Sequence, residues 1–184
     1  MNYYYDLLFQ PDEEVPIYFI RNKVFSKLHK TLYDLKANDI GVSFPEYKVL
    51  LGKTLRLHSN QQNLEKLQAT NWLGGLSGYC QITEIKPIPD KVKYRTISRK
   101  QANMTEAKLR RLIKRGSITV DDTKKYKAKM FSQGLDNTYL ELDSSSTGHK
   151  HRRYIEFGKL QNTLINGEFD YFGLSKIATI PWFQ

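Results

Sequence analysis

Strand-like and helix-like segments alternate along the first 85 residues, and their order restricts the folds that the chain can adopt. Asn2–Phe9 is aromatic and apolar and predicts a strand. Residues 16–35 predict an amphipathic helix, because apolar side chains recur at spacings of three and four. The apolar positions are Ile20, Val24, Leu28, Leu32 and Leu35. The segments expected next are strands at Ile40–Phe44 and Leu55–His58, a helix at Gln61–Leu67 and a strand at Tyr79–Ile85.

The order β-α-β-β-α-β is typical of ferredoxin-like domains. We therefore expect an α+β protein with a ferredoxin-like domain over residues 1–88, since residues 86–90 contain two prolines and predict an extended linker. Residues 89–184 then form a smaller α+β domain. Its expected elements are a strand at Tyr94–Ser98, helices at Thr105–Arg115 and Asp121–Phe131, strands at Thr138–Leu142 and Arg152–Phe157, a hairpin turning at Asn166-Gly167, and a closing segment at Leu174–Ile180.

The charge is unevenly distributed along the chain. The sequence has a net charge of +10, yet residues 1–90 carry 10 basic and 10 acidic side chains. Residues 91–184 carry 19 basic and 9 acidic side chains, so the whole excess lies in the second half. A surplus confined to one region indicates a polyanionic partner, most often a nucleic acid.

The helix predicted at Thr105–Arg115 concentrates this charge. Glu106 is the only acid between Lys91 and Arg115, against ten Lys or Arg residues. Leu109, Leu112 and Ile113 define its expected buried stripe. The remaining basic side chains favour contacts with phosphates, although a solvated helix face is the alternative. The helix residues expected to bind nucleic acid are Lys108, Arg110, Arg111, Lys114 and Arg115.

Other features exclude several classes of protein. Cys80 is the only cysteine, which rules out an internal disulfide and favours a cytoplasmic location. No apolar run approaches the ~20 residues of a membrane-spanning helix. The acidic residues lack the spacing of a two-metal nuclease, and no phosphate-binding GxxxxGK[ST] loop is present. We expect neither a metal nor a cofactor.

Four histidines are available for acid–base chemistry. The pattern alone favours a core-boundary role for His29 and a structural role for His58. His149 and His151 lie in residues 144–153, where five hydroxyl or glycine positions precede five basic or imidazole positions, Arg152 among them. This segment fits a phosphate-binding loop and a polar hairpin tip equally well.

One reaction needs neither metal nor cofactor. RNA carries its own nucleophile, the 2′-hydroxyl, beside the phosphate to be cleaved. A histidine can accept that proton, and in-line attack then leaves a 2′,3′-cyclic phosphate and a 5′-hydroxyl. A serine can orient the 2′-hydroxyl, and cationic groups can stabilise the phosphorane.

A set of short segments, in order from end to end, resembles the CRISPR repeat-processing endoribonucleases of type I-F systems, the Csy-type branch of the Cas6 group. These segments are Phe25-Ser26-Lys27-Leu28-His29, Ile40-Gly41-Val42-Ser43-Phe44-Pro45, Leu55-Arg56-Leu57-His58, Tyr94-Arg95, Ser98-Arg99, Gln101, Leu109-Arg110-Arg111, Ser146-Thr147-Gly148, Gly173-Leu174-Ser175-Lys176 and Pro181-Trp182-Phe183. The resemblance implies a protein that binds the repeat stem-loop of precursor RNA and cleaves it at the 3′ base of the stem without metal. It also implies that the protein keeps its product and joins the other subunits of a surveillance complex.

The resemblance also assigns roles to individual residues. The family's catalytic histidine falls on His29, against the reading from the pattern alone, and its catalytic serine falls on Ser144, with Ser146 as a neighbour able to substitute. Arg99 and Gln101 match residues that read bases near the foot of the stem. The basic helix corresponds to the helix that lies in the major groove of the hairpin.

Two positions depart from the family pattern. Phe172 stands where the family has an active-site tyrosine, so the hydroxyl is absent, and we expect its ring to contact the RNA. Tyr171 is adjacent, but a strand would direct it to the opposite face. His151 occupies the position where relatives stack an aromatic ring under the stem. A non-catalytic subunit that holds an RNA hairpin is therefore the main alternative, and a basic DNA-binding or ribosome-associated protein is a weaker one.

Overall fold

The structure is a computed structural model that describes residues 1–101, 105–132, 137–143 and 150–184. The chain divides into two compact units. Unit 1 comprises Met1–Arg99 and Thr138–Gln184, and unit 2 comprises Lys100–Asn137.

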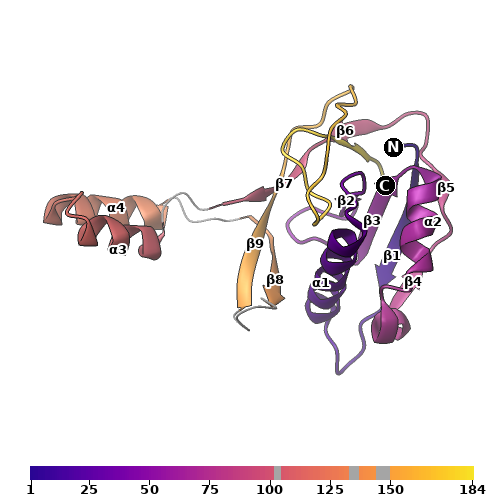
Figure 1. Cartoon of the computed structure of the whole chain (residues 1–184), viewed down its shortest axis with the longest axis horizontal. Helices are drawn as coiled ribbons and strands as arrows, with labels where there is room; N and C mark the ends of the chain where they lie inside the picture. The colour runs from indigo at the N-terminus through magenta and orange to yellow at the C-terminus, as the bar shows by residue number, and fades with distance from the viewer. Residues whose placement is uncertain (102–104, 133–136, 144–149) are drawn as a thin grey trace. The chain divides into compact units, whose positions relative to one another are not determined.

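Unit 1 is built on an antiparallel sheet whose main strands follow the order β2-β3-β1-β4 (Figure 1). Helix α1 connects β1 to β2, and α2 with the 3-10 helix η1 connects β3 to β4. A short strand, β5, extends the sheet beside β1. The bounds of these elements are β1 Tyr3–Phe9, α1 Ile17–Leu35, β2 Gly41–Ser43, β3 Thr54–Ser59, α2 Gln61–Ala69, η1 Gly74–Tyr79, β4 Cys80–Ile82 and β5 Lys86–Pro87.

The apolar stripe predicted for the first helix is the face that α1 buries. Ile20, Val24, Leu28 and Leu32 are at most 1% exposed, and Leu35 packs partly buried against the same core. Strand β3 is buried along its whole length, as expected for a central strand with both faces covered. In the part of the chain that the structure describes, the α+β class is confirmed as helices combined with antiparallel sheets.

The C-terminal half adds two small antiparallel sheets to unit 1. One pairs β10 with β6, and the other has the order β7-β9-β8. Strand β8 packs against α1, and the Glu141 backbone N–H donates to Oδ1 of Asn22 over 3.3 Å. The bounds are β6 Lys93–Arg95, β7 Ile97–Lys100, β8 Tyr139–Asp143, β9 Lys150–Phe157 and β10 Ile180–Trp182.

These contacts divide the chain differently from the predicted boundary after residue 88. Strands β6 to β10 belong to the same compact unit as the first sheet, because β8 contacts α1 and β10 contacts β2. The excursion Lys100–Asn137 forms a unit of its own. That residues 1–88 and 89–184 fold as separate domains stays a prediction.

Two local predictions, the hairpin at Asn166-Gly167 and the linker at residues 86–90, are wrong in the described structure. No strands flank Asn166-Gly167, so that turn does not close a hairpin; the Ile165 backbone N–H instead donates to the Thr179 hydroxyl, and the Ile165 carbonyl accepts from the Thr179 backbone N–H. Strand β10 begins at Ile180, the last residue of the expected closing segment Leu174–Ile180. The expected linker contains β5, since Lys86 and Pro87 pair with β1.

Unit 2 contains a pair of helices, α3 at Glu106–Lys114 and α4 at Val120–Ser132, which confirm the helices predicted at Thr105–Arg115 and Asp121–Phe131. Thr105 caps α3, because its side chain accepts from the Lys108 N–H over 3.1 Å. Gly116 follows the helix with φ +65°, a left-handed conformation that glycine tolerates. Among the described residues, no helix is long and apolar enough to cross a membrane.

Candidate active site

His29 lies in α1 at the edge of the buried stripe and is only partly exposed. Its Nδ1 is 2.9 Å from the carbonyl oxygen of Tyr171. Because a carbonyl oxygen can only accept, Nδ1 carries the proton of the neutral ring and donates it. Nε2 is then the ring nitrogen with a lone pair, which is the tautomer that a general base needs.

Phe172 fixes the plane of this imidazole. The two rings stack with centroids 3.5 Å apart and planes 9° apart. Phe25, from the preceding turn of α1, lies 6.0 Å from the Phe172 ring and closes the buried side. Phe172, which replaces the tyrosine of the family pattern, thus supports His29 by stacking, although it carries no hydroxyl.

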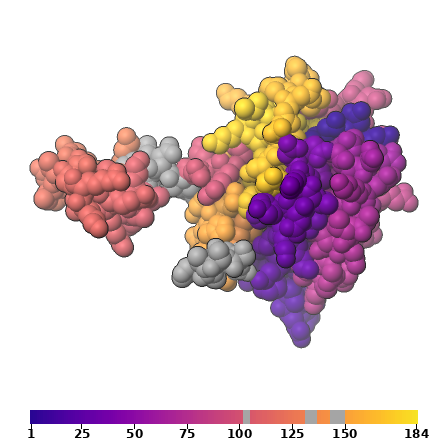
Figure 2. Space-filling model, viewed as in Figure 1, coloured from indigo at the N-terminus to yellow at the C-terminus, as the bar shows by residue number. Residues whose placement is uncertain are grey.

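A tight turn over residues 170–173 presents Tyr171 and Phe172 to α1. Asp170 Oδ1 accepts from the backbone N–H groups of Phe172 and Leu174, and Gly173 adopts φ +69°. A Cβ on Gly173 would lie 2.6 Å from Val42 Cγ1, so this position requires glycine. Figure 2 shows the C-terminal segment, in yellow, against the N-terminal part of unit 1, in indigo.

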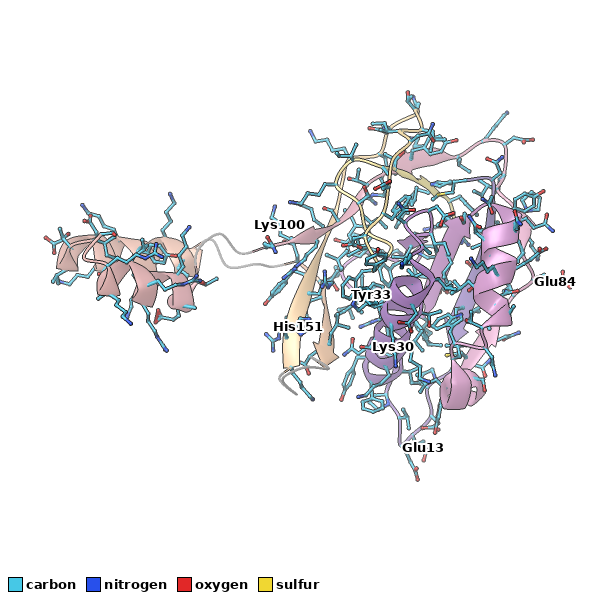
Figure 3. All side chains as sticks on the ribbon, in the orientation of Figure 1. Glu13, Lys30, Tyr33, Glu84, Lys100 and His151 are labelled. Carbon is cyan, nitrogen blue, oxygen red and sulfur yellow. The ribbon has the colours of Figure 1, made fainter. Side chains whose placement is uncertain are left out.

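Tyr171 therefore lies in a turn, and the strand expected there is wrong. Its ring still points away from His29, because it packs edge-on against Tyr33 with centroids 5.3 Å apart. Tyr33 is one helical turn after His29 on α1, and Figure 3 labels it. Residues 171 and 172 thus contact successive turns of the same helix.

Arg153, from β9, lies on the other side of Phe172. Its Cζ is 3.4 Å from the Phe172 ring centroid and the side chain is almost completely buried. Both His29 and Arg153 lie directly over the ring within van der Waals contact, so they occupy opposite faces. Burial, together with the charge of Arg99, lowers the pKa of Arg153 to about 10, and Asp170 partly offsets this effect. Arg153 is not among the site residues predicted from the sequence.

The sequence-predicted residues of β7 and β9 differ in their surroundings. Arg99 is exposed at β7 and is close enough to Arg153 to act on its charge. Arg152 points to the opposite face from Arg153, with its Cζ 4.6 Å from the Tyr139 ring and its Nε 3.9 Å from Glu141. His151 is exposed on β9 (Figure 3). The two predicted serines, Ser144 and Ser146, lie outside the described residues.

The basic helix α3 exposes all five of the predicted side chains, Lys108, Arg110, Arg111, Lys114 and Arg115. Its buried stripe is narrower than predicted, because Leu109 alone is fully buried and Ile113 is 50% exposed. A two-helix unit covers only one row of side chains, which explains the difference. Gln101 is also exposed, at the start of unit 2.

His58 has no place in this site. It is completely buried on β3, and its Nε2 is 2.8 Å from Ser43 Oγ. Burial, with the nearby charge of Arg56, holds its pKa well below 6.5. Within the described ranges, no cluster of three or more His, Cys, Asp or Glu side chains could hold a metal ion.

Comparison of the sequence with models of protein families identifies the class to which this chain belongs. Residues 4–183 match the model of the CRISPR-associated protein family Cas_Csy4. The chain therefore belongs to the Cas_Csy4 family, and the resemblance to the Csy-type branch of the Cas6 group is confirmed.

Two curated relatives carry the name CRISPR-associated endonuclease Cas6/Csy4. The protein from Escherichia coli (strain UTI89 / UPEC) is 36% identical over 184 residues, and the one from Pseudomonas aeruginosa (strain UCBPP-PA14) is 36% identical over 187 residues. Both alignments cover 100% of each chain. The match to a solved structure of Thermus thermophilus Cse3, bound to an RNA representing a pre-cleavage complex, covers 98% of this chain and 100% of that chain, with 12% identity and a TM-score of 0.36.

Proposed function

We propose that this protein is a metal-independent endoribonuclease that binds the repeat stem-loop of precursor CRISPR RNA and cleaves it at the 3′ base of the stem. The observation that carries the proposal is the geometry of His29, whose Nδ1 donates to the Tyr171 carbonyl and whose ring stacks on Phe172. Both curated relatives are named as endonucleases, which supports the same reaction class.

In the proposed reaction, Nε2 of His29 accepts the proton of the 2′-hydroxyl. The 2′-oxygen attacks the adjacent phosphorus in line, and the bond to the 5′-oxygen breaks. The leaving 5′-oxygen takes up a proton from water, so the products are a 2′,3′-cyclic phosphate and a 5′-hydroxyl. Ser144, or Ser146 in its place, orients the 2′-hydroxyl, and no metal or cofactor takes part.

The proposed RNA contacts combine several of the exposed polar groups described above. The basic side chains of α3 contact phosphates along the hairpin and give the binding its salt dependence. Arg99 and Gln101 contact the foot of the stem, and His151 and Arg152, both exposed on β9, make further contacts with the RNA. The imidazole of His151 stacks under the stem less strongly than a larger aromatic ring would.

We also propose a ferredoxin-like fold for the first domain and a role in a larger assembly. The sheet order β2-β3-β1-β4, with α1 and α2 as its crossovers, supports the fold assignment. After cleavage the protein keeps the guide RNA and joins the other subunits of a type I-F surveillance complex.

The proposed function is tested by incubating the purified chain with its organism's repeat hairpin in EDTA. A matched substrate carries a single 2′-deoxy sugar at the expected cleavage site. We expect cleavage of the all-ribose hairpin alone, with a cyclic phosphate at the new 3′ end. Cleavage that requires a divalent cation, or that also occurs on the deoxy substrate, would contradict the mechanism.

A second candidate function is that of a non-catalytic subunit that binds the hairpin and caps the 3′ end of the guide. The observation in its favour is Phe172, which supplies a ring but no hydroxyl beside His29. Tight binding of both substrates in the same assay, without cleavage of either, would support this candidate over the first.

A further inference from the structure

Arg153 carries a buried guanidinium charge in unit 1 whose surroundings do not account for it. The residue is 8% exposed, and its Nε has no hydrogen-bond partner. Among the described residues, no carboxylate lies within ion-pair distance of it. A buried charge without an ion-pair partner costs stability, and an apolar side chain of similar size is often tolerated better. Its presence at this position therefore calls for a role other than stabilising the fold.

The surroundings of Arg153 connect it to His29. The guanidinium covers one face of Phe172 at 3.4 Å, and the imidazole covers the other at 3.5 Å. A planar cation on a ring face is an attractive and orientation-dependent contact. Phe172 has no hydroxyl through which a hydrogen bond could hold it, so the contacts on its two faces decide where its ring lies.

The backbone of β9 explains why Arg153 and not Arg152 has this position. Successive side chains of a strand point to opposite faces. Arg153 pairs with Leu140 of β8 and is buried, whereas Arg152 pairs with Glu141 and is exposed. Because β8 also packs against α1, the strand that carries Arg153 is held against the helix that carries His29.

We propose that Arg153 is a positioning residue for RNA cleavage: it holds the Phe172 ring from behind and thereby orients the His29 imidazole toward the 2′-hydroxyl. This inference rests on the proposed endoribonuclease activity. Arg153 itself does not touch the RNA. A displacement of about 1 Å in a reacting group can cost about 100-fold in rate, so the loss of this support affects the chemical step.

The test uses Arg153→Met, which keeps an unbranched side chain and removes the charge and the planar group. We expect the single-turnover cleavage rate to fall by about 10- to 100-fold. The dissociation constant for the uncleavable 2′-deoxy hairpin should stay within about twofold, and the melting temperature should be unchanged or higher. Arg153→Lys, which keeps the charge without the planar group, should restore part of the rate.

Arg95→Met is the matched control, because Arg95 is also an arginine of unit 1 stacked on aromatic rings, Phe157 and Trp182. Its Nε and Nη2 both donate to the Gly158 carbonyl, at 3.0 and 2.7 Å. We expect this variant to lower the melting temperature and to leave cleavage unchanged. Arg153→Met should thus lower the cleavage rate without lowering the melting temperature, whereas Arg95→Met should do the reverse. This contrast separates a positioning role from structural support.

A double-variant cycle shows whether the effect passes through Phe172. Phe172→Ala alone should slow cleavage, and adding Arg153→Met should slow it no further. The proposal would be overturned if the effects of the two substitutions on the cleavage rate were fully additive. It would also be overturned if Arg153→Met cleaved within twofold of the unaltered rate, or if its rate fell together with its RNA affinity or melting temperature.

If the unaltered chain does not cleave RNA, the proposed function is wrong. The contact between Arg153, Phe172 and His29 can still be tested, without any cleavage assay. The NMR signals of the His29 ring protons are shifted by the Phe172 ring current and report the stack directly. Arg153→Met should move these signals, and Arg95→Met should not. Unchanged His29 signals in both variants would overturn the positioning role independently of any cleavage.

Discussion

Arg56 and Arg153 are two buried arginines that stack on aromatic rings in the same unit, yet their surroundings are opposite. Arg56 donates from Nε and Nη2 to both oxygens of Asp6, at 2.6 and 2.8 Å, and its Cζ lies over the rings of Tyr4 and Phe183. Arg153 has a ring on one side and no carboxylate partner among the described residues. A buried cation that is paired with a carboxylate supports the fold, whereas one that lies beside a candidate base without such a pair indicates a functional requirement.

Arg56→Met gives the largest expected change in stability. The substitution leaves the Asp6 carboxylate, which is 16% exposed, without its partner, and this costs roughly 3–5 kcal/mol in the free energy of unfolding. Chemical denaturation measures this cost, and Arg153→Met is the comparison. Equal destabilisation by the two substitutions would remove the distinction between the two arginines.

Gly173→Ala tests the turn that brings Phe172 to His29. The new Cβ would approach Val42 Cγ1 to 2.6 Å at a φ of +69°, so the turn has to move. We expect a loss of about 1–3 kcal/mol in stability and a slower cleavage rate with unchanged hairpin affinity. Gly116→Ala is the control, since its φ is +65° and no atom lies within 4 Å of the new Cβ. If both variants cleave at the same rate, the turn does not position the base.

The pH dependence of stability follows from His58, which is beside Arg56. Burial and the charge of Arg56 hold the pKa of folded His58 well below its unfolded value of 6.5, so the unfolded chain binds the extra proton. The stability contribution is therefore complete above pH 6.5 and is lost as the pH falls below it, by at most about 1.4 kcal/mol per pH unit. Denaturation of His58→Gln between pH 7 and pH 5 should show a flatter dependence. An unchanged slope would assign the effect to other groups.

In contrast to the two buried arginines, the exposed arginines of α3 should have the smallest effect on stability. Because Arg111 and Arg115 are exposed, replacing both with Ala should change the free energy of unfolding by less than about 1 kcal/mol. Hairpin affinity should fall, and the slope of its logarithm against log salt should flatten by about one to two units. Lys124→Ala with Lys125→Ala on α4 removes the same charge as a control. An equal effect from both pairs would mean that α3 has no special role.

Local patterns predicted the elements whose signal lies in neighbouring residues. The spacing of Val24, Leu28 and Leu32 gave the buried face of α1, and Thr105 gave the start of α3. The pairing of β6 with β10 was not predictable in this way, because it joins Tyr94 to Pro181 across most of the second half of the chain.

The candidate site shows the same limit. The family resemblance indicated His29 and Phe172, while the residue pattern alone favoured a core-boundary histidine. Arg153 was missed because a pair of adjacent arginines does not reveal which one is buried; the register of β9 against β8 decides that. The turn at residues 170–173 depends on Asp170 within the turn and on Gly173, whose hydrogen bond with Val42 is equally non-local.

The most direct test of the account is the cleavage rate of His29→Ala on the repeat hairpin in EDTA, measured beside its affinity for the 2′-deoxy hairpin. Removal of a general base predicts a rate loss of about 100- to 10,000-fold with affinity within about twofold of the unaltered chain. Cleavage at the unaltered rate would show that His29 is not the base, whatever holds its ring in place.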